Sequence, residues 1–316
     1  MLKRTVVFFD DTHPIMPLQL EDLGFVCIDH SKSTFESMKP ALSTAFGLVG
    51  RSRFRLDENF LKACPHLQFI ARSGVGTEHI DLSYAQAQQI KVFTSPEGSA
   101  DTVGEHTLGI LLMLMNHLGR ADRQVRSGQW IREGNRGTEL KGKTIGILGY
   151  GNMGKSLARK LKGLEVQCIT YDKYLNEYGD DNAIQVDLPT FFRETDVLAI
   201  HIPYLPSNHY FINRTFLESF HKPIYVVNAA RGMVLHTEHL VEGLSSGKIL
   251  GAALDVLEYE DGSFSTLKAS GNPAPLEYLI QSELTVLSPH IAGWSYESLK
   301  GHAEVLVNKI SQNFCR

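Results

Sequence analysis

The chain has 316 residues, of which 43% are apolar and 21% charged, and its formal net charge is −4. This length exceeds that of a usual single hydrophobic core and predicts two domains in a soluble globular protein. The weak acidic balance excludes a charge-driven nucleic-acid partner, and the longest apolar run, Ile110 to Met115, is too short to cross a membrane.

Residues 1 to about 97 alternate between short apolar runs and helical patterns. This alternation is typical of a parallel sheet covered by helices on both faces. The expected strands are Thr5–Phe9, Phe25–Asp29, Gly47–Gly50, Leu67–Ala71 and Lys91–Thr94. The expected helices are Thr34–Ala45, Glu58–Ala63 and Leu82–Gln89.

The loop after the fourth expected strand runs from Arg72 to Thr77 and contains two glycines. Ligands of parallel sheets gather at the carboxyl ends of the strands, where this loop lies. The backbone N–H groups around Gly74 and Gly76, beside an arginine, would form an anion cradle. A glycine turn next to a surface arginine explains the same residues, and the sequence leaves both interpretations open.

From about residue 100 to Gly119 the chain is apolar nearly all round, which predicts a helix buried between two domains. His106 lies on this helix, and we expect a structural role for it. The next stretch, Arg120 to Arg136, is polar and contains five arginines. It is either a solvated arm or a segment that exchanges contacts with a second subunit.

A glycine-rich turn, Gly149-Tyr150-Gly151-Asn152-Met153-Gly154, separates an apolar strand from an amphipathic helix. Strand, glycine turn and helix in this order favour dinucleotide binding. Gly149 permits the turn, Gly151 lets the backbone approach a pyrophosphate, and Gly154 lets helix and strand pack closely. The start of the helix adds free N–H groups and the positive end of a dipole.

The next expected strand, Val166–Tyr171, is followed by Asp172, which lies 172 − 154 = 18 residues past the last glycine. An acid about 20 residues past that glycine binds the adenosine ribose in dinucleotide-binding folds. An ordinary aspartate at a strand end is the alternative. Lys173 would tolerate a 2′-phosphate, but Asp172 would repel one, so we expect NAD rather than NADP.

The alternation continues to the end of the sequence, with a stretch rich in Gly, Ser and Pro at 261–275 that we expect to be a loop or insertion. The pattern predicts an α/β fold of two doubly wound parallel-sheet domains, with residues 99–289 inserted between 1–98 and 290–316. The expected strands are Val197–Ile202, Ile224–Asn228, Leu250–Val256 and Leu284–Leu287. The expected helices are Asp187–Glu194, Arg214–Phe220, Leu235–Ser246 and about Tyr296–Phe314.

Three of these strand ends carry ionisable side chains. Arg231 follows one strand, Asp255 and Glu260 lie at the end of the next, and His290 follows a third. A parallel sheet brings such ends to one edge. Arginine clamps a carboxylate, and a histidine beside an acid transfers protons near neutral pH. With a nicotinamide, these are the parts needed to interconvert a 2-hydroxy acid and a 2-oxo acid.

The cysteines are widely spaced and contain no C-x-x-C pair, so we expect neither a disulfide framework nor a metal site. A reducing cytoplasm is the simplest setting for such a chain. The cysteines are Cys27, Cys64, Cys168 and Cys315.

Together these motifs resemble the D-isomer-specific 2-hydroxyacid dehydrogenase family, and the resemblance covers nearly the whole chain. It implies a Rossmann-like NAD domain inserted into a flavodoxin-like substrate-binding domain, in agreement with the boundaries expected above. The motifs are the glycine turn, His201-Ile202-Pro203, Asn228-Ala229-Ala230-Arg231-Gly232, Asp255-Val256 with Glu260, and Ser288-Pro289-His290-Ile291-Ala292-Gly293.

The resemblance also implies a role for individual residues. Arg231 would bind the substrate carboxylate and carbonyl, His290 would be the general acid and base, and Glu260 would pair with His290. Asp255 would hold the nicotinamide carboxamide, and His201 and Pro203 would line the adenosine side. The implied NAD site consists of Gly149, Tyr150, Gly151, Asn152, Met153, Gly154, Asp172, His201, Pro203, Ala229, Asp255 and Gly293.

On the substrate side, the resemblance places the substrate carboxylate on the backbone of Ser73, Gly74 and Val75. In the family, dimers form through the long helix and the arm after residue 100, so a homodimer is expected here. No nucleic acid and no membrane are expected as partners.

Within the family, residues 72–76 and 130–142 look most like 3-phosphoglycerate dehydrogenases of serine biosynthesis. Arg72 would face the substrate phosphate, and Arg51 and Arg53 would add charge. No C-terminal regulatory domain is expected. A glyoxylate or hydroxypyruvate reductase, or a D-lactate-type dehydrogenase, is the alternative, because Ser99 stands where many relatives have asparagine. A dinucleotide-sensing interaction protein without turnover is a more remote alternative.

Overall fold

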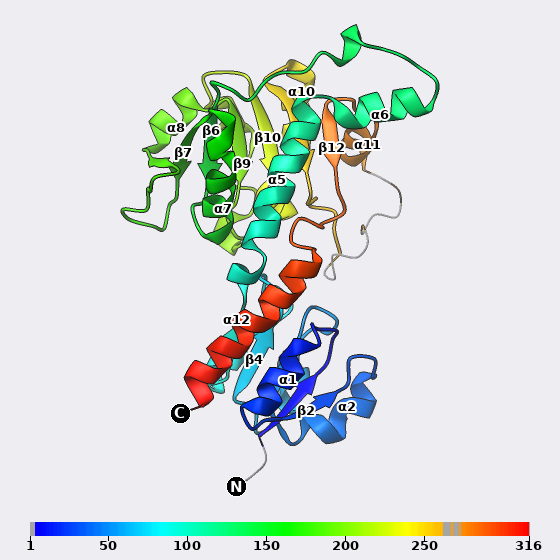
Figure 1. The fold of residues 1–316 in the computed structure, drawn as a ribbon, viewed down its shortest axis with the longest axis vertical. Helices are drawn as coiled ribbons and strands as arrows, with labels where there is room; N and C mark the ends of the chain where they lie inside the picture. Colours follow the sequence, from blue (N-terminus) through cyan, green and yellow to red (C-terminus); the bar gives the residue numbers. More distant parts are fainter. Residues whose placement is uncertain (1–3, 262–266, 268–270, 272, 316) are drawn as a thin grey trace. The chain divides into compact units, whose positions relative to one another are not determined.

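The computed structural model describes residues 4–261, 267, 271 and 273–315, and the chain divides into two compact units (Figure 1). Unit 1 consists of Met1–Ser99 and Trp294–Arg316, and unit 2 is Ala100–Gly293. The chain therefore leaves unit 1 once and returns to it once. The return comes a few residues later than the sequence suggested, so that His290 lies in unit 2.

Unit 1 is built on a parallel five-stranded sheet, counted over its described residues, with the strand order β2-β1-β3-β4-β5. The short apolar runs expected from the sequence form these strands, with ends that differ by one or two residues. The strands are β1 (Thr5–Phe8), β2 (Val26–Asp29), β3 (Ala45–Gly50), β4 (Phe69–Arg72) and β5 (Lys91–Phe93).

Helices cover both faces of this sheet because side chains alternate between the faces along each strand. Val6 and Phe8 of β1 pack into the core under α1 and α12, whereas Val7 and Phe9 pack into the core under α2, α3 and α4. The helices are α1 (Ile15–Asp22), α2 (Phe35–Leu42), α3 (Glu58–Lys62), α4 (Leu82–Ala87) and α12 (Tyr296–Phe314).

Unit 2 is built on a larger parallel sheet with the order β12-β11-β10-β9-β6-β7-β8. The chain starts at β6 in the interior and moves outward first to β7 and β8, then to β9 and beyond. This reversal opens a crevice at the carboxyl end of β6, where ligands of such sheets bind. The strands are β6 (Thr144–Leu148), β7 (Gln167–Tyr171), β8 (Ile184–Gln185), β9 (Val197–Ile200), β10 (Ile224–Asn228), β11 (Ile249–Leu254) and β12 (Thr285–Leu287).

Two hydrophobic cores lie on opposite faces of this sheet. The long apolar helix α5 and helix α7 run side by side on one face, and α8, α9, α10 and α11 cover the other (Figure 1). The helices are α5 (Ala100–Met115), α6 (Leu118–Arg126), α7 (Asn152–Leu161), α8 (Leu188–Glu194), α9 (Arg214–Glu218), α10 (Thr237–Ser246) and α11 (Ala274–Gln281). Within the described ranges, none of the helices of either unit has the length and apolarity needed to cross a membrane.

Among the helices and strands of the described residues, four were not expected from the sequence: α1, α6, the two-residue strand β8, and α11. Helix α11 starts inside the stretch 261–275 that we expected to be a loop, because Pro273 precedes a short apolar helix that packs Leu276 and Leu279. Most of the remaining loop lies outside the described residues. The two-sided parallel architecture itself is confirmed.

Candidate active site

The glycine turn lies directly after β6, at the crevice of the unit 2 sheet. Gly149 has a φ of 93°, and a Cβ there would meet the backbone of His201 at 2.8 Å. A Cβ on Gly154 would collide with the Gly149 carbonyl, whereas one on Gly151 would project into open space. The protein thus leaves room in front of Gly151, at the start of α7, where a pyrophosphate would bind.

Asp172 follows β7 and is held by the backbone of the neighbouring loops. Its carboxylate accepts hydrogen bonds from the N–H groups of Tyr150 and Tyr174, both at 2.9 Å. The Tyr150 side chain itself is fully buried and donates to Asp180 at 2.8 Å, so only its backbone faces the turn. The strand-end acid is therefore fixed beside the glycine turn, as dinucleotide binding requires.

His201 follows β9 and lies against the glycine turn. Neither ring nitrogen has a hydrogen-bond partner among the described residues. Burial lowers the pKa of His201 to about 4, so the ring is neutral near pH 7. Pro203 is exposed in the same loop, and Ala229 is half-buried after β10. Whether these residues touch the adenosine or the nicotinamide remains a prediction.

The turn after β10 presents Arg231. Buried Asn228 braces this turn, because its amide donates to the Arg231 carbonyl at 3.1 Å and its oxygen accepts from the Ala230 N–H at 3.0 Å. A Cβ on Gly232 would overlap the Leu257 backbone, so only glycine lets the two loops come this close. The Arg231 turn therefore packs against the loop that carries Glu260.

His290 and Glu260 form a direct pair within unit 2. His290 Nδ1 lies 2.6 Å from Glu260 Oε2, and both side chains are largely buried, with 21% and 13% exposure. Glu260 also accepts from the Leu257 N–H at 2.5 Å. The acid therefore engages Nδ1 of the imidazole ring.

Asp255 lies under this pair and is completely buried. Burial by itself raises the pKa of its carboxyl, but hydrogen bonds from His106, Ser288 and the N–H groups of Ile291 and Ala292 outweigh it. The pKa of Asp255 is therefore below its ordinary value, and the carboxylate stays charged. Its expected contact with a nicotinamide carboxamide remains a prediction.

In unit 1, the loop after β4 differs in detail from the expected anion cradle. The Ser73 N–H already donates to the Gly50 carbonyl at 2.8 Å, and the Gly74 N–H donates to Ser95 Oγ at 3.0 Å. Over the described residues, the N–H groups of Val75 and Gly76 have no such acceptor. Of the expected donors, Ser73 and Gly74 are thus already used, whereas Val75 and Gly76 have no acceptor among the described residues.

Cationic side chains surround this loop. Arg72 Nη1 donates to the Ser73 carbonyl at 2.8 Å, and Arg51 stacks on the Trp294 ring at 4.9 Å. Arg53, by contrast, donates to a row of backbone carbonyls that includes Phe9 and Ser33. Arg53 therefore has a structural role through Nη1 and Nη2, and the expectation that it adds charge for a ligand stays a prediction.

Two buried histidines lie close to these arginines. His302 Nδ1 is 2.9 Å from both the hydroxyl and the carbonyl of Ser95, and His79 is 8% exposed. Burial, aided by the charge of Arg72, lowers the pKa of each histidine to about 4. Both rings are therefore neutral near pH 7, and the positive charge at this edge of unit 1 comes from the arginines.

Comparison with known proteins matches residues 108–292 to the NAD-binding domain of the D-isomer specific 2-hydroxyacid dehydrogenases. The chain belongs to this family.

Its dehydrogenase relatives have different substrates in their names. A hydroxypyruvate reductase of Thermotoga maritima is 33% identical over 83% of each chain. A D-3-phosphoglycerate dehydrogenase of Archaeoglobus fulgidus is 32% identical over 79% of this chain, which spans 46% of that protein. The crystal structure of a D-lactate dehydrogenase of Aquifex aeolicus with NAD and lactic acid has a TM-score of 0.80, with 26% identity over 98% of this chain and 95% of that one.

The cofactor of this 2-hydroxyacid dehydrogenase is NAD, as the sequence suggested. The open space in front of Gly151, the uncapped start of α7 and the fixed carboxylate of Asp172 fit a dinucleotide. When bound, NADH supplies a hydride. Among residues 4–261, 267, 271 and 273–315, no three His, Cys, Asp or Glu side chains converge as a metal site.

Three residues that organise the dehydrogenase site were not recognised as such in the sequence. Asn228 and Gly232 shape the Arg231 turn, and their only sequence signal is their place in the motif around Arg231. Ser288 donates to Asp255 at 2.6 Å. A single polar residue next to a strand end gives no indication of such a partner.

Proposed function

We propose that this dehydrogenase interconverts 3-phosphoglycerate and 3-phosphohydroxypyruvate with NAD(H), using Arg231, Glu260 and His290 as catalytic residues. The observation that carries the proposal is the 2.6 Å contact between His290 Nδ1 and Glu260 in the same unit as the glycine turn. An acid–histidine pair beside a nicotinamide can move a proton while the cofactor moves a hydride.

In the direction of reduction, the guanidinium of Arg231 binds the substrate carboxylate and polarises the 2-oxo group. The carbonyl carbon accepts the hydride, and His290 Nε2 gives its proton to the carbonyl oxygen, so that a hydroxyl forms. Glu260 balances the positive charge of the imidazolium before that transfer. In the direction of oxidation, the neutral His290 takes the hydroxyl proton back.

The substrate carboxylate would bind the free N–H groups of Val75 and Gly76. Arg72 and Arg51 would bind the phosphate, because arginine offers a planar pair of donors that matches phosphate oxygens. Arg51 supports this role, since it is only loosely paired with Asp10, at 3.8 Å. The substrate would thus carry two anionic groups, one for each set of donors.

The change Arg72→Ala tests the substrate. For 3-phosphohydroxypyruvate we expect kcat/KM to fall about 10- to 100-fold, since a hydrogen bond to a charged group contributes ~1.5–3 kcal/mol. For hydroxypyruvate and glyoxylate we expect little change. Arg55→Ala is the matched control, because it removes an exposed arginine from the loop next to Arg53. Equal losses with phosphorylated and plain substrates would reject phosphate recognition by Arg72.

A second candidate is reduction of unphosphorylated 2-oxo acids such as hydroxypyruvate, glyoxylate or pyruvate. It is favoured by the bond from Arg72 Nη1 to the Ser73 carbonyl, which turns part of the guanidinium toward its own backbone. This candidate predicts that the wild-type enzyme prefers plain 2-oxo acids in a panel with NADH. If no 2-oxo acid is reduced but NADH binds tightly, a dinucleotide-sensing role replaces both candidates.

We also propose a preference for NAD over NADP. A 2′-phosphate would meet the carboxylate of Asp172, which accepts from three backbone N–H groups and cannot turn away without losing them. Lys173, next in the sequence, offers a positive charge. The measurement is kcat/KM with NADH against NADPH, and equal values would reject the preference.

A homodimer formed through the arm after α6 is the proposed assembly. The segment between α6 and β6 runs over the outside of unit 2 (Figure 1). It carries exposed apolar side chains, with Trp130 at 80% and Ile131 at 45% exposure. Apolar side chains of this size on a polar arm are typical of interface anchors.

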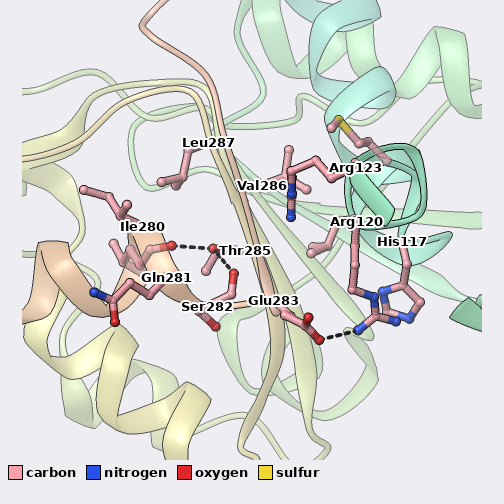
Figure 2. A pocket seen from close by; sticks show the side chains of 14 residues that line it. His117, Arg120, Arg123, Ile280, Gln281, Ser282, Glu283, Thr285, Val286 and Leu287 are labelled. Atoms are coloured by element: carbon pink, nitrogen blue, oxygen red, sulfur yellow. Dashed lines mark hydrogen bonds and ion pairs between the residues drawn. The ribbon is translucent and has the colours of Figure 1, made fainter. Parts of the chain in front are cut away.

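The same unit offers a surface suited to such an arm. A cavity of about 480 Å³ lies between the end of α5, the start of α6 and the helix–strand pair α11–β12 (Figure 2). Its lining combines Ile280 and Leu287 with Arg120 and Arg123, and Arg120 is paired with Glu283 at 3.0 Å. Arg123 has no partner in the described part of the chain, so it can stack on an aromatic ring of a second copy.

Sedimentation velocity tests the assembly. We expect Trp130→Ala to shift the protein from dimer toward monomer, and Trp294→Ala, which removes the other exposed tryptophan, to leave the dimer intact. A wild-type monomer at micromolar concentration would reject the proposed dimer.

A reducing compartment such as the cytoplasm is the proposed setting. The cysteines among the described residues are free, and burial raises the pKa of Cys64 to about 12 and that of Cys168 to about 11. Such thiols stay protonated and unreactive. Fractionation of the source cells would test this setting.

A further inference from the structure

Helix α5 reaches the catalytic loops of unit 2 through one side chain, His106. Its Nε2 lies 3.1 Å from Ser288 Oγ and 3.3 Å from Asp255 Oδ1, and its side chain is 20% exposed. Ser288 precedes His290, and Asp255 begins the loop that carries Glu260. His106 therefore meets both catalytic loops where they touch, although we expected only a structural role for it from the sequence.

Asp255 is the centre of this junction. Its carboxylate accepts from Ser288 Oγ at 2.6 Å, from the Ile291 N–H at 2.9 Å and from the Ala292 N–H at 2.8 Å. Its carbonyl accepts from the His290 N–H at 2.7 Å. One residue thus binds the backbone of His290 and of both residues that follow it.

The backbone of His290 needs such support. Its φ of 55° lies in the left-handed region, which is unfavourable for a non-glycine residue. A conformation of this kind persists only where the surrounding contacts determine it. Glu260 fixes the ring of His290, and the Asp255 junction fixes the backbone that aims the ring.

We propose that His106 is a positioning residue for His290. By donating to Asp255 and Ser288, it holds the junction that keeps the imidazole in line for proton transfer. This inference rests on the acid–base role proposed for His290. Asp255 is fully buried, so loss of one donor leaves a charged group underbonded and loosens the loop that it organises.

The experiment compares His106→Ala and His106→Gln in the full-length chain. We expect His106→Ala to lower kcat about 10- to 100-fold, because a misplacement of ~1 Å at a reacting group costs about that much. KM for NADH should stay near the wild-type value, and the pH profile of kcat should shift. The amide of His106→Gln can donate to Asp255, so it should restore most of the activity and the wild-type profile. His221→Ala, at an exposed turn, is the control.

A second measurement separates failure of this inference from failure of the proposed function. NMR of the imidazole protons reports the bond between His290 Nδ1 and Glu260 without any turnover. We expect the His290 Nδ1–H signal to shift or broaden in His106→Ala and to return in His106→Gln. If that signal and the pH profile are unchanged in His106→Ala, and only its melting temperature falls, His106 is merely structural and the proposal is overturned. If the wild type reduces no 2-oxo acid, the proposed function fails, and the NMR signal alone decides the role of His106.

Discussion

The two sheets of this dehydrogenase carry opposite kinds of polar groups at their carboxyl ends. In unit 1 the edge holds arginines and free backbone N–H groups, represented by Arg51, Arg72 and Val75. In unit 2 it holds carboxylates with their donors, represented by Asp255 and Glu260. The unit 1 edge is therefore suited to binding an anion, whereas the unit 2 edge adds an acid–histidine pair to Arg231 and the glycine turn.

The two edges also differ in how firmly they are held. In unit 2, side chains bind across separate loops with short hydrogen bonds, so the geometry of His290 is determined by several contacts. In unit 1, the contacts of the Arg51 side chain with the described residues include a 3.8 Å ion pair and a ring contact. Proton transfer depends on the distance and angle between donor and acceptor. Anion binding by arginine tolerates adjustment of the side-chain position. The predictions below test this division of labour.

The largest effect is expected at the unit 2 edge, which carries His290 and Glu260. His290→Gln should lower kcat about 10³-fold with every 2-oxo acid, because removal of a general acid–base costs roughly 10²- to 10⁴-fold. Steady-state kinetics with phosphorylated and plain substrates measures it, and NADH affinity should be unchanged. A loss of kcat with only one substrate would mean that His290 contributes to substrate recognition and does not transfer the proton.

The glycine turn of unit 2 should respond next. Gly151→Ala places a methyl group in the open space in front of α7, and we expect NADH to bind about tenfold more weakly, or ~1.4 kcal/mol. Gly163→Ala also adds a methyl group in open space, but away from the turn, and serves as the control. Fluorescence titration measures the affinity of both variants for NADH. Equal affinities would mean that the pyrophosphate does not bind in front of Gly151.

A separate effect, on stability and not on catalysis, concerns unit 1. His79 and His302 have their pKa lowered from the ordinary 6.5 to about 4, so the unfolded chain binds more protons between these values. The free energy of unfolding should therefore fall as the pH drops from about 6.5 to 4, by up to about 1.4 kcal/mol per pH unit for each histidine.

Hydrogen exchange of unit 1 amides at several pH values checks this slope. His302→Asn should reduce it, since one of the two buried histidines of unit 1 then no longer contributes to it. A slope that is the same in wild type and His302→Asn would mean that His302 is not kept neutral by burial.

The sequence by itself determined the family, the cofactor, the two-domain α/β architecture and the order of nearly all its elements. These follow from local signals, since the period of apolar residues defines each strand and helix, and the glycine turn has a fixed spacing to its strand and helix. The resemblance also singled out Glu260 and His290 before their 2.6 Å contact was known.

Only the tertiary structure decided which polar groups are already used. The Arg53 guanidinium donates to backbone carbonyls, and the Gly74 N–H donates to Ser95 Oγ. His106 contacts Ser288, which lies 182 residues further along the chain. Such partners have no local spacing, because the packing of whole elements brings them together. Whether a hydrogen-bonding group has a partner depends on its neighbours in space. The sequence therefore identified these residues but could not predict their hydrogen-bond partners.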